Sequence, residues 1–247
     1  MSQPEKDLIV FDMDGVLVDV GESYRAAIQA TVLHFTGTEP TGDEVQVWKN
    51  RGGFNDDWKL SHRMIQERGE EASFEDVVSR FQQIFLGNMW GNMPSCPSTP
   101  EAVSGLPDGL ILRERWLATE GLFDRLAANH TLAIFTGRLG WEAQLTLDRF
   151  AKDIFNPVVG VDHVQHAKPH PEGLHKIRAT VPHGKIWYLG DTVDDARAAR
   201  AAGVPFIGIA SPDAPRCTEL AQLLRDEGAI TVLDDINSLE AALATNG

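Results

Sequence analysis

Two aspartates one residue apart follow an apolar run near the start of the chain. Residues 8–11 are Leu-Ile-Val-Phe, and they lead directly into Asp12 and Asp14. Two carboxylates this close repel each other, and burying them costs free energy unless a cation or a proton lies between them. The pair therefore predicts either a turn in water or a site for a positive ion.

Polar side chains also follow two later apolar runs. They are Thr136 and Arg138, with Gly137 between them, after residues 132–135, and Asp191, Thr192, Asp194 and Asp195 after residues 186–189. Lys168 stands between these groups, in the stretch AKPHPEG. Each residue alone is typical of a helix cap or a solvated surface. Capping alone, however, gives no reason for carboxylates, a hydroxyl and an ammonium to gather, so a joint functional interpretation is favoured.

Such a set of groups is suited to phosphate chemistry. Carboxylate oxygens bind hard cations, usually Mg²⁺, which keeps several waters and takes up substrate phosphate. A lysine and a hydroxyl can hold the remaining phosphate oxygens, and a carboxylate can act as a nucleophile. Because the uncatalysed hydrolysis of phosphate monoesters is among the slowest reactions known, several such groups must act together.

The apolar runs that precede these residues indicate strands of a parallel sheet. They are continuous rather than alternating, as in strands covered on both faces, and span residues 8–11, 132–135, 158–161, 186–189, 205–209 and 230–233. Helical patterns lie between the later runs, at 171–180, 194–202 and 218–227. This alternation predicts an α/β doubly wound parallel sheet, in which ligands bind at the carboxyl ends of the strands.

The segment between the first two strands is far longer than one crossover requires. It carries helical patterns at 23–35, 57–68 and 74–86, and a Pro- and Ser-rich stretch at 91–100 that is typical of a linker. Ser73 and Asp76 have the spacing of a capping box for the last of these helices. We therefore expect two domains, an α/β core of residues 1–19 and 100–247 and an inserted small helical domain of residues 20–99.

Residues 49–58, KNRGGFNDDW, are the most unusual part of this insert. Gly52 and Gly53 permit a left-handed backbone or a close approach, which would let Arg51 and Asn55 reach a substrate. An ordinary helix end followed by a turn explains the same residues equally well. Both interpretations stay open.

Composition restricts the partners of the chain. Its formal net charge is −14 and its isoelectric point about 4.9, which argues against nucleic acid or an anionic membrane as a partner. Two cysteines far apart, Cys96 and Cys217, form neither a disulfide framework nor a zinc ligand set. The first residues, MSQPEKD, do not resemble a signal peptide, and no apolar run approaches the ~20 residues of a membrane span. We expect a cytoplasmic protein that acts on a small molecule. The sequence gives no basis for a prediction of its oligomeric state.

Four stretches of the sequence resemble the motifs of the haloacid dehalogenase-like (HAD) hydrolase superfamily. They are DMDGVLVD, IFTGR, AKPHPEG and GDTVDD, in the order in which that superfamily carries them. The resemblance covers residues 5–19 and 120–210. The helical insert lies where the phosphatase branch has a C1-type cap. The resemblance thus implies a Rossmann-like core with a cap that selects the substrate.

The resemblance also implies a role for each matched residue. Asp12 would be the nucleophile that forms an aspartyl-phosphate, and Asp14 the general acid and base. The implied phosphate-binding residues are Thr136, Gly137 and Lys168. The implied Mg²⁺ ligands are Asp12, Asp14 through its backbone carbonyl, Asp191 and Asp195, with the neighbouring Asp194 as an open alternative to Asp195.

Asp14 distinguishes between branches of the superfamily. Its dehalogenases have no acid there and its transport ATPases have a threonine, so the resemblance implies a phosphatase or a phosphomutase. An acid makes sense at this position because an alkoxide leaving group needs a proton. Arg138 departs from many relatives and would either touch the substrate or pair with Glu142, four residues on.

We therefore expect an Mg²⁺-dependent phosphatase that acts on a small phosphorylated metabolite. A phosphomutase with the same nucleophile is one alternative, and a non-catalytic binding module that retains the fold is another. Phosphoglycolate, sugar phosphates, amino-alcohol phosphates and nucleotides all stay open as substrates.

Overall fold

The computed structural model describes residues 5–89 and 108–246, so the expected linker at 91–100 lies outside the described residues. The chain forms two compact units. One comprises Met1–Asp19, Lys49–Asn55 and Trp116–Gly247, and the other Val20–Trp48 and Asp56–Arg115. The expected domain boundaries at 19 and 100 stay a prediction.

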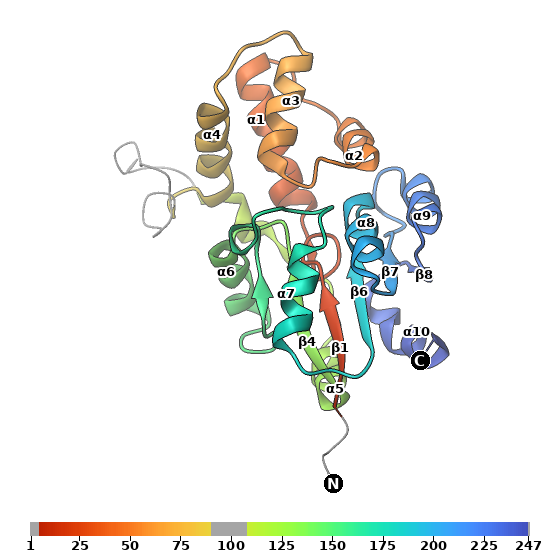
Figure 1. Cartoon of the computed structure of the whole chain (residues 1–247). Coiled ribbons are helices and arrows are strands. Elements are labelled where there is room, and N and C mark those ends of the chain that lie inside the picture. The colour runs from red at the N-terminus through yellow and green to blue at the C-terminus, as the bar shows by residue number, and fades with distance from the viewer. Residues whose placement is uncertain (1–4, 90–107, 247) are drawn as a thin grey trace. The chain divides into compact units, whose positions relative to one another are not determined.

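The first unit is built on a six-stranded parallel sheet with the strand order β5-β4-β1-β6-β7-β8 (Figure 1). The strands are β1 (Asp7–Phe11), β4 (His130–Phe135), β5 (Val158–Val159), β6 (Ile186–Gly190), β7 (Phe206–Ile209) and β8 (Thr231–Leu233). Every predicted strand is present, although β5 ends early because a 3₁₀ turn begins at Val161. The doubly wound α/β fold is thereby confirmed. Along the chain, the strands extend from β1 in one direction as β4 and β5 and then in the other direction as β6, β7 and β8. Folds of this kind bind ligands at the point where the strand order reverses.

Both faces of the sheet are covered. Successive residues of a strand point to opposite sides, so β1 contributes side chains to the packing on each face. Leu8 and Val10 of β1 join a core with Leu174. On the other face, the ring of Phe11 packs edge-on against Phe123 at a centroid distance of 5.7 Å. The helices of this unit are α5 (Leu122–Asn129), α6 (Gly140–Phe150), α7 (Glu172–Thr180), α8 (Val193–Ala202), α9 (Cys217–Asp226) and α10 (Leu239–Asn246). In Figure 1, α7 and α8 lie in front of the sheet.

The second unit is helical. Its helices α1 (Ala26–Thr36), α3 (Asp57–Glu67) and α4 (Phe74–Leu86) pack against one another around buried side chains such as Ile28, Leu60 and Phe81. All three were predicted. Ser73 caps α4 as expected, since its hydroxyl accepts from the backbone N–H of Asp76 at 3.1 Å. Two short strands, β2 (Val18–Asp19) and β3 (Arg115–Trp116), form a separate small sheet.

Helix α2 (Gly42–Arg51) was not predicted. Its apolar residues are few, so they give no clear helical periodicity. Its N-terminus nevertheless carries a readable signal in Thr41 and Glu44. The Thr41 hydroxyl accepts from the Glu44 backbone N–H at 3.1 Å, and the Glu44 carboxylate accepts from the Thr41 backbone N–H at 2.7 Å. This is a capping box, which marks a helix start without any apolar stripe.

Among the residues that the structure describes, no helix combines the length and the apolar character needed to traverse a bilayer.

Candidate active site

The carboxyl ends of three neighbouring strands bring the candidate residues to one edge of the sheet. The register pairs Phe11 of β1 with Ile134 of β4 and with Leu189 of β6. Asp12 follows Phe11 directly, and Thr136 and Asp191 stand two residues beyond the two partners. Parallel pairing therefore gathers side chains that are far apart in the sequence.

Lys168 reaches this edge from the loop before α7. Its buried ammonium lies 2.9 Å from Asp12 Oδ1 and 2.7 Å from Asp195 Oδ1, over the ring of Phe135 at 5.0 Å. Burial by itself would lower the pKa of Lys168, but the two carboxylates outweigh it and raise that pKa to about 12. Lys168 is thus a fixed positive charge beside Asp12.

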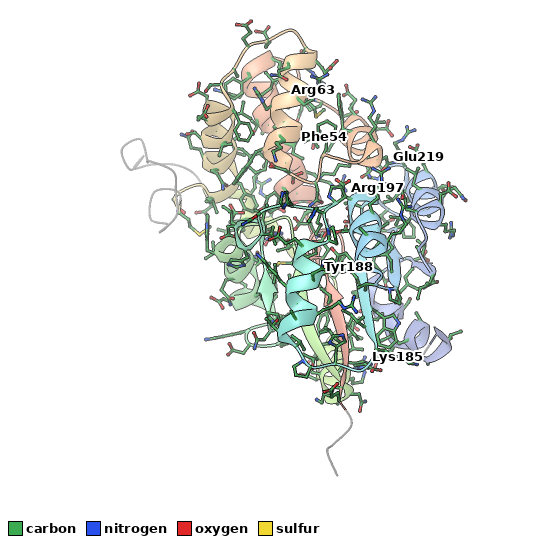
Figure 2. The ribbon with its side chains drawn as sticks, viewed as in Figure 1. Phe54, Arg63, Lys185, Tyr188, Arg197 and Glu219 are labelled. Atoms are coloured by element: carbon green, nitrogen blue, oxygen red, sulfur yellow. The ribbon has the colours of Figure 1, made fainter. Side chains whose placement is uncertain are left out.

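The carboxylate of Asp195 is fully engaged by donors. Its Oδ1 takes Lys168 and the hydroxyl of Tyr188, which donates at 2.6 Å from the central strand β6 (Figure 2). Its Oδ2 accepts from the backbone N–H of Thr192 at 3.1 Å and from the Thr192 hydroxyl at 2.6 Å. Four donors therefore engage its two oxygens. Asp195 therefore holds the lysine in place.

Asp194 points elsewhere, although it is the next residue in the chain. Both of its carboxylate oxygens accept from the backbone N–H of Gly53, at 2.9 and 2.8 Å. Of the two neighbours, Asp195 is the one that lies with Asp12 and Asp191.

Asp12 is surrounded by excess negative charge. Burial raises the pKa of Asp12 well above its ordinary range, and although Lys168 lowers it, the carboxylates of Asp195, Asp191 and Asp14 raise it further. One ammonium thus faces several carboxylates. Such an arrangement favours a further cation, which would relieve the repulsion.

The donors present fit a hard cation such as Mg²⁺. Oxygens of Asp12, Asp191 and Asp195 lie within 4.8 Å of one another, and carboxylate oxygen is the ligand type that Mg²⁺ prefers. Gly15 lets the main chain after Asp14 come close to them. It has φ +71°, and a Cβ there would lie 2.0 Å from Asp191 Oδ2. Only glycine fits this position without displacing Asp191.

Arg138 clamps Asp14. Its Nε donates to Asp14 Oδ1 at 2.8 Å, its Nη2 donates to the same oxygen, and its Nη1 donates to Thr146 Oγ1 at 2.8 Å. The Arg138 side chain is 1% exposed, whereas that of Asp14 is 28% exposed. A buried guanidinium therefore orients a carboxylate that remains accessible.

The remaining candidates are placed differently from one another. Thr136 is buried and its hydroxyl accepts from the backbone N–H of Arg138 at 3.2 Å. A Cβ at Gly137 would lie 2.5 Å from Asn55 Nδ2, so a side chain there would displace the Asn55 amide. Arg51 ends α2 and is exposed. The structure thus brings Asn55 close to Gly137 of the second motif.

The sequence analysis assigned no role to three supporting residues, Tyr188, Thr192 and Thr146. Tyr188 carries the one hydroxyl in the apolar strand β6, and a buried tyrosine usually finds a partner for its O–H. Thr192 and Asp195 have capping-box spacing, which was readable. Thr146 gave no local signal. It lies in α6, and its partner Arg138 lies eight positions earlier, on the loop before that helix.

A family model described as haloacid dehalogenase-like hydrolase matches residues 6–203. The chain belongs to this family. The HAD resemblance read from the four motifs is therefore confirmed, and the chain is a hydrolase by family.

Two curated relatives of this HAD-like hydrolase carry different names. An imidazoleglycerol-phosphate dehydratase of Phytophthora nicotianae is 30% identical over 223 residues, which cover 86% of this chain but 45% of that protein. The chain thus spans less than half the length of that relative. A phosphoglycolate phosphatase of Salmonella paratyphi A is 25% identical over 220 residues, covering 81% of this chain and 80% of that enzyme.

Solved structures support the same fold. A conserved haloacid dehalogenase-like protein of unknown function from Agrobacterium tumefaciens superposes with a TM-score of 0.69 at 20% identity. The match covers 98% of this chain and 99% of that one.

Proposed function

We propose that this HAD-like hydrolase is an Mg²⁺-dependent phosphatase that forms an aspartyl-phosphate on Asp12. The observation that carries the proposal is the buried ammonium of Lys168, held 2.9 Å from Asp12 by Asp195 at the edge of the sheet. A fixed cation next to a buried carboxylate is suited to a reaction that brings a phosphoryl group to that carboxylate. The phosphatase name of the Salmonella relative supports the same reaction class.

Asp12 is the nucleophile in this proposal. One of its carboxylate oxygens forms a bond to phosphorus as the bond between phosphorus and the leaving oxygen breaks. Lys168 binds the phosphoryl oxygens as charge shifts onto them, and it stays protonated because its pKa is raised. Asp195 acts through Lys168, as the residue that fixes the ammonium.

Asp14 moves the proton. Its Oδ1 is taken by Arg138, so Oδ2 carries the proton to the leaving oxygen. The same oxygen then accepts a proton from the water that attacks the aspartyl-phosphate, which releases phosphate and restores Asp12. Arg138 keeps the carboxylate oriented in both steps.

Asp12 and Asp191 are the side chains best suited to hold Mg²⁺, together with the backbone carbonyl of Asp14. Asp195 would not ligate the ion directly, because donors already engage both of its oxygens, and it would act by holding Lys168 in place. When bound, the ion supplies positive charge that offsets the carboxylates and the phosphoryl oxygens.

The test is phosphate release from a panel of phosphorylated metabolites, with Mg²⁺ and with EDTA. Phosphoglycolate, sugar phosphates, amino-alcohol phosphates and nucleotides belong in the panel. We expect release that requires both Mg²⁺ and Asp12, with Asp12→Asn inactive but folded. Asp213→Asn, at an exposed position, is the matched control and should retain full activity.

Two other outcomes would contradict the proposal. Activity that appears only with a sugar bisphosphate, with little net release of phosphate, would identify a phosphomutase. Saturable binding of a panel compound without turnover would identify a binding module that retains the fold.

A further inference from the structure

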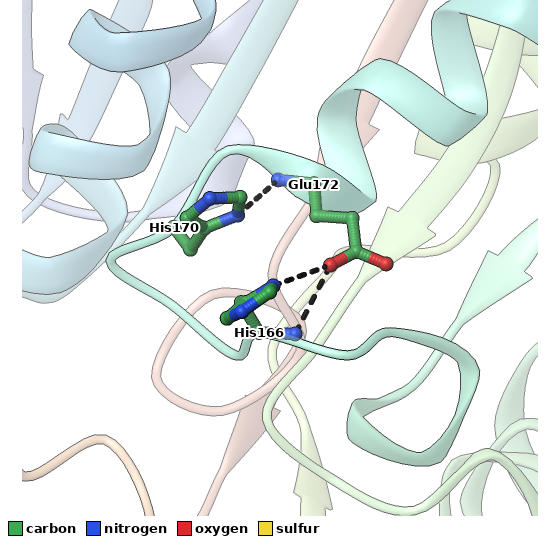
Figure 3. Close-up of side chains that lie close together, drawn as sticks. All are labelled: His166, His170 and Glu172. Atoms are coloured by element: carbon green, nitrogen blue, oxygen red, sulfur yellow. Dashed lines mark hydrogen bonds and ion pairs between the residues drawn. The ribbon is translucent and has the colours of Figure 1, made fainter.

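Two histidines and a glutamate form a second cluster around the Lys168 loop. They are His166, His170 and Glu172 (Figure 3), and each offers one ligand atom within 4.8 Å of the other two. His166 and His170 are exposed and Glu172 is half-buried. None of them belongs to the carboxylate cluster at Asp12.

The carboxylate of Glu172 is held in position before any ligand arrives. Its Oε2 accepts from the backbone N–H of His166 at 3.0 Å and lies 3.2 Å from the Nδ1 of the same residue. Its Oε1 accepts from the backbone N–H of Gln165 at 3.0 Å and pairs with Lys176 at 2.9 Å. These donors lower the pKa of Glu172 to about 2, so the carboxylate is ionised at neutral pH.

The two imidazoles are also kept together. His170 Nδ1 accepts from the backbone N–H of Glu172 at 3.3 Å, and the ring centroids of His166 and His170 are 4.7 Å apart. In Figure 3 the His166 ring faces the carboxylate of Glu172, and the His170 ring faces the backbone nitrogen of the same residue. The cluster is therefore assembled from three residues of one short loop and the first turn of α7.

Two imidazoles and one carboxylate are a ligand set for borderline transition metals rather than for Mg²⁺. Imidazole suits Zn²⁺, Cu²⁺ and Ni²⁺, whereas Mg²⁺ prefers oxygen alone. Tetrahedral Zn²⁺ with bonds of about 2.0–2.1 Å places neighbouring ligand atoms about 3.4 Å apart. Small movements of two exposed side chains would bring the three atoms to that spacing.

We propose that His166, His170 and Glu172 bind a transition-metal dication of the Zn²⁺ class, with the fourth position open to water. Lys168 lies between the two histidines in the chain, so drawing them together shifts the loop that holds its ammonium between Asp12 and Asp195. Occupation of the site is then inhibitory. This last consequence rests on the proposed phosphatase function, whereas the binding itself does not.

The test is direct titration of the full chain with Zn²⁺ against a chromophoric chelator, with saturating Mg²⁺ to occupy the carboxylate site. We expect one tight equivalent in the wild type. His166→Gln, His170→Gln and the double variant should each bind about tenfold or more weakly, because each lacks a ligand. Co²⁺ as a spectroscopic probe should give tetrahedral absorption bands that the double variant loses.

Two controls separate this site from others. His34→Gln changes an exposed histidine on α1 and should leave the affinity unchanged. Asp191→Asn disturbs the carboxylate cluster and should also keep the tight Zn²⁺ equivalent. Equal affinity in the wild type and the double variant would overturn the proposal, as would loss of the site in Asp191→Asn.

Turnover provides the second readout. Zn²⁺ added to the Mg²⁺ enzyme should inhibit the wild type at concentrations that leave the double variant active. Inhibition that is identical in both would place the inhibitory ion at the carboxylate site and would overturn the inhibitory role. Because the titration needs no substrate, its result stands even if the protein proves not to be a phosphatase.

Discussion

Asp14 and Arg138 offer a test of proton transfer at the scale of single residues. Asp14→Asn should reduce kcat/KM for an alkyl phosphate by about 10²–10⁴-fold, the usual contribution of a general acid. It should reduce kcat/KM for p-nitrophenyl phosphate far less, since nitrophenolate leaves without a proton. We choose kcat/KM because it reports the steps up to departure of the leaving group. Equal losses for the two substrates would exclude Asp14 as the general acid.

Tyr188 tests how Asp195 is supported. Tyr188→Phe removes one of the four donors to that buried carboxylate, and a hydrogen bond to a charged group contributes about 1.5–3 kcal/mol. We expect a lower free energy of unfolding by about that amount, measured in urea, together with a lower kcat because Lys168 is held less firmly. An unchanged stability would show that the remaining donors suffice.

At the scale of elements, the turn after β1 depends on a glycine. Gly15→Ala places a Cβ 2.0 Å from Asp191 Oδ2 and also strains a backbone at φ +71°. Gly37→Ala is the matched control, because Gly37 has φ +69° and nothing within 4 Å of its Cβ position. Both variants should lose about 1–2 kcal/mol of stability from the left-handed backbone. Only Gly15→Ala should lose Mg²⁺-dependent activity, and similar activities in the two would contradict the role given to this turn.

The start of α7 provides a pH dependence at the same scale. The pKa of Glu172 is lowered to about 2, mainly by Lys176 and by the backbone N–H of Gln165. Because the folded pKa lies below the unfolded one, its stabilising effect is present above about pH 4.5 and is lost as the pH falls toward 2. The difference in Tm between wild type and Glu172→Gln should thus be constant at neutral pH and should shrink below about 4.5. A difference that persists unchanged in acid would exclude this ionisation as the cause.

At the scale of the whole molecule, the carboxylate cluster links metal binding to stability. Mg²⁺ bound to the folded chain should raise its Tm, by an amount that corresponds to about 2.7 kcal/mol when Mg²⁺ is at a hundred times its Kd. Asp191→Asn should lose this dependence. Differential scanning fluorimetry at several Mg²⁺ concentrations measures both.

Ca²⁺ should raise the Tm of the wild type as well, yet inhibit turnover, since its looser and larger coordination shell suits the site less well. Full activity with Ca²⁺ would contradict a site suited to Mg²⁺.

The sequence by itself determined the sheet and the residues that stand at its edge. Continuous apolar runs such as residues 8–11 and 186–189 indicate buried parallel strands because burial on both faces leaves no place for alternation. The polar residues after those runs then fall at one edge by topology alone. Four family motifs carried the same information, and the roles that they imply for Asp12, Asp14 and Lys168 stay predictions that the experiments above address.

Only the tertiary structure decided which side chain meets which. Asp194 and Asp195 are neighbours in the chain, but successive residues of a helix diverge, and only Asp195 faces Lys168 while Asp194 meets Gly53. Arg138 finds its partner Asp14 across 124 positions of sequence, a pairing that no local pattern encodes. Strands and caps arise from short-range periodicity and chemistry, whereas the partners of buried charges depend on how distant segments pack, and that is the part that had to be seen in three dimensions.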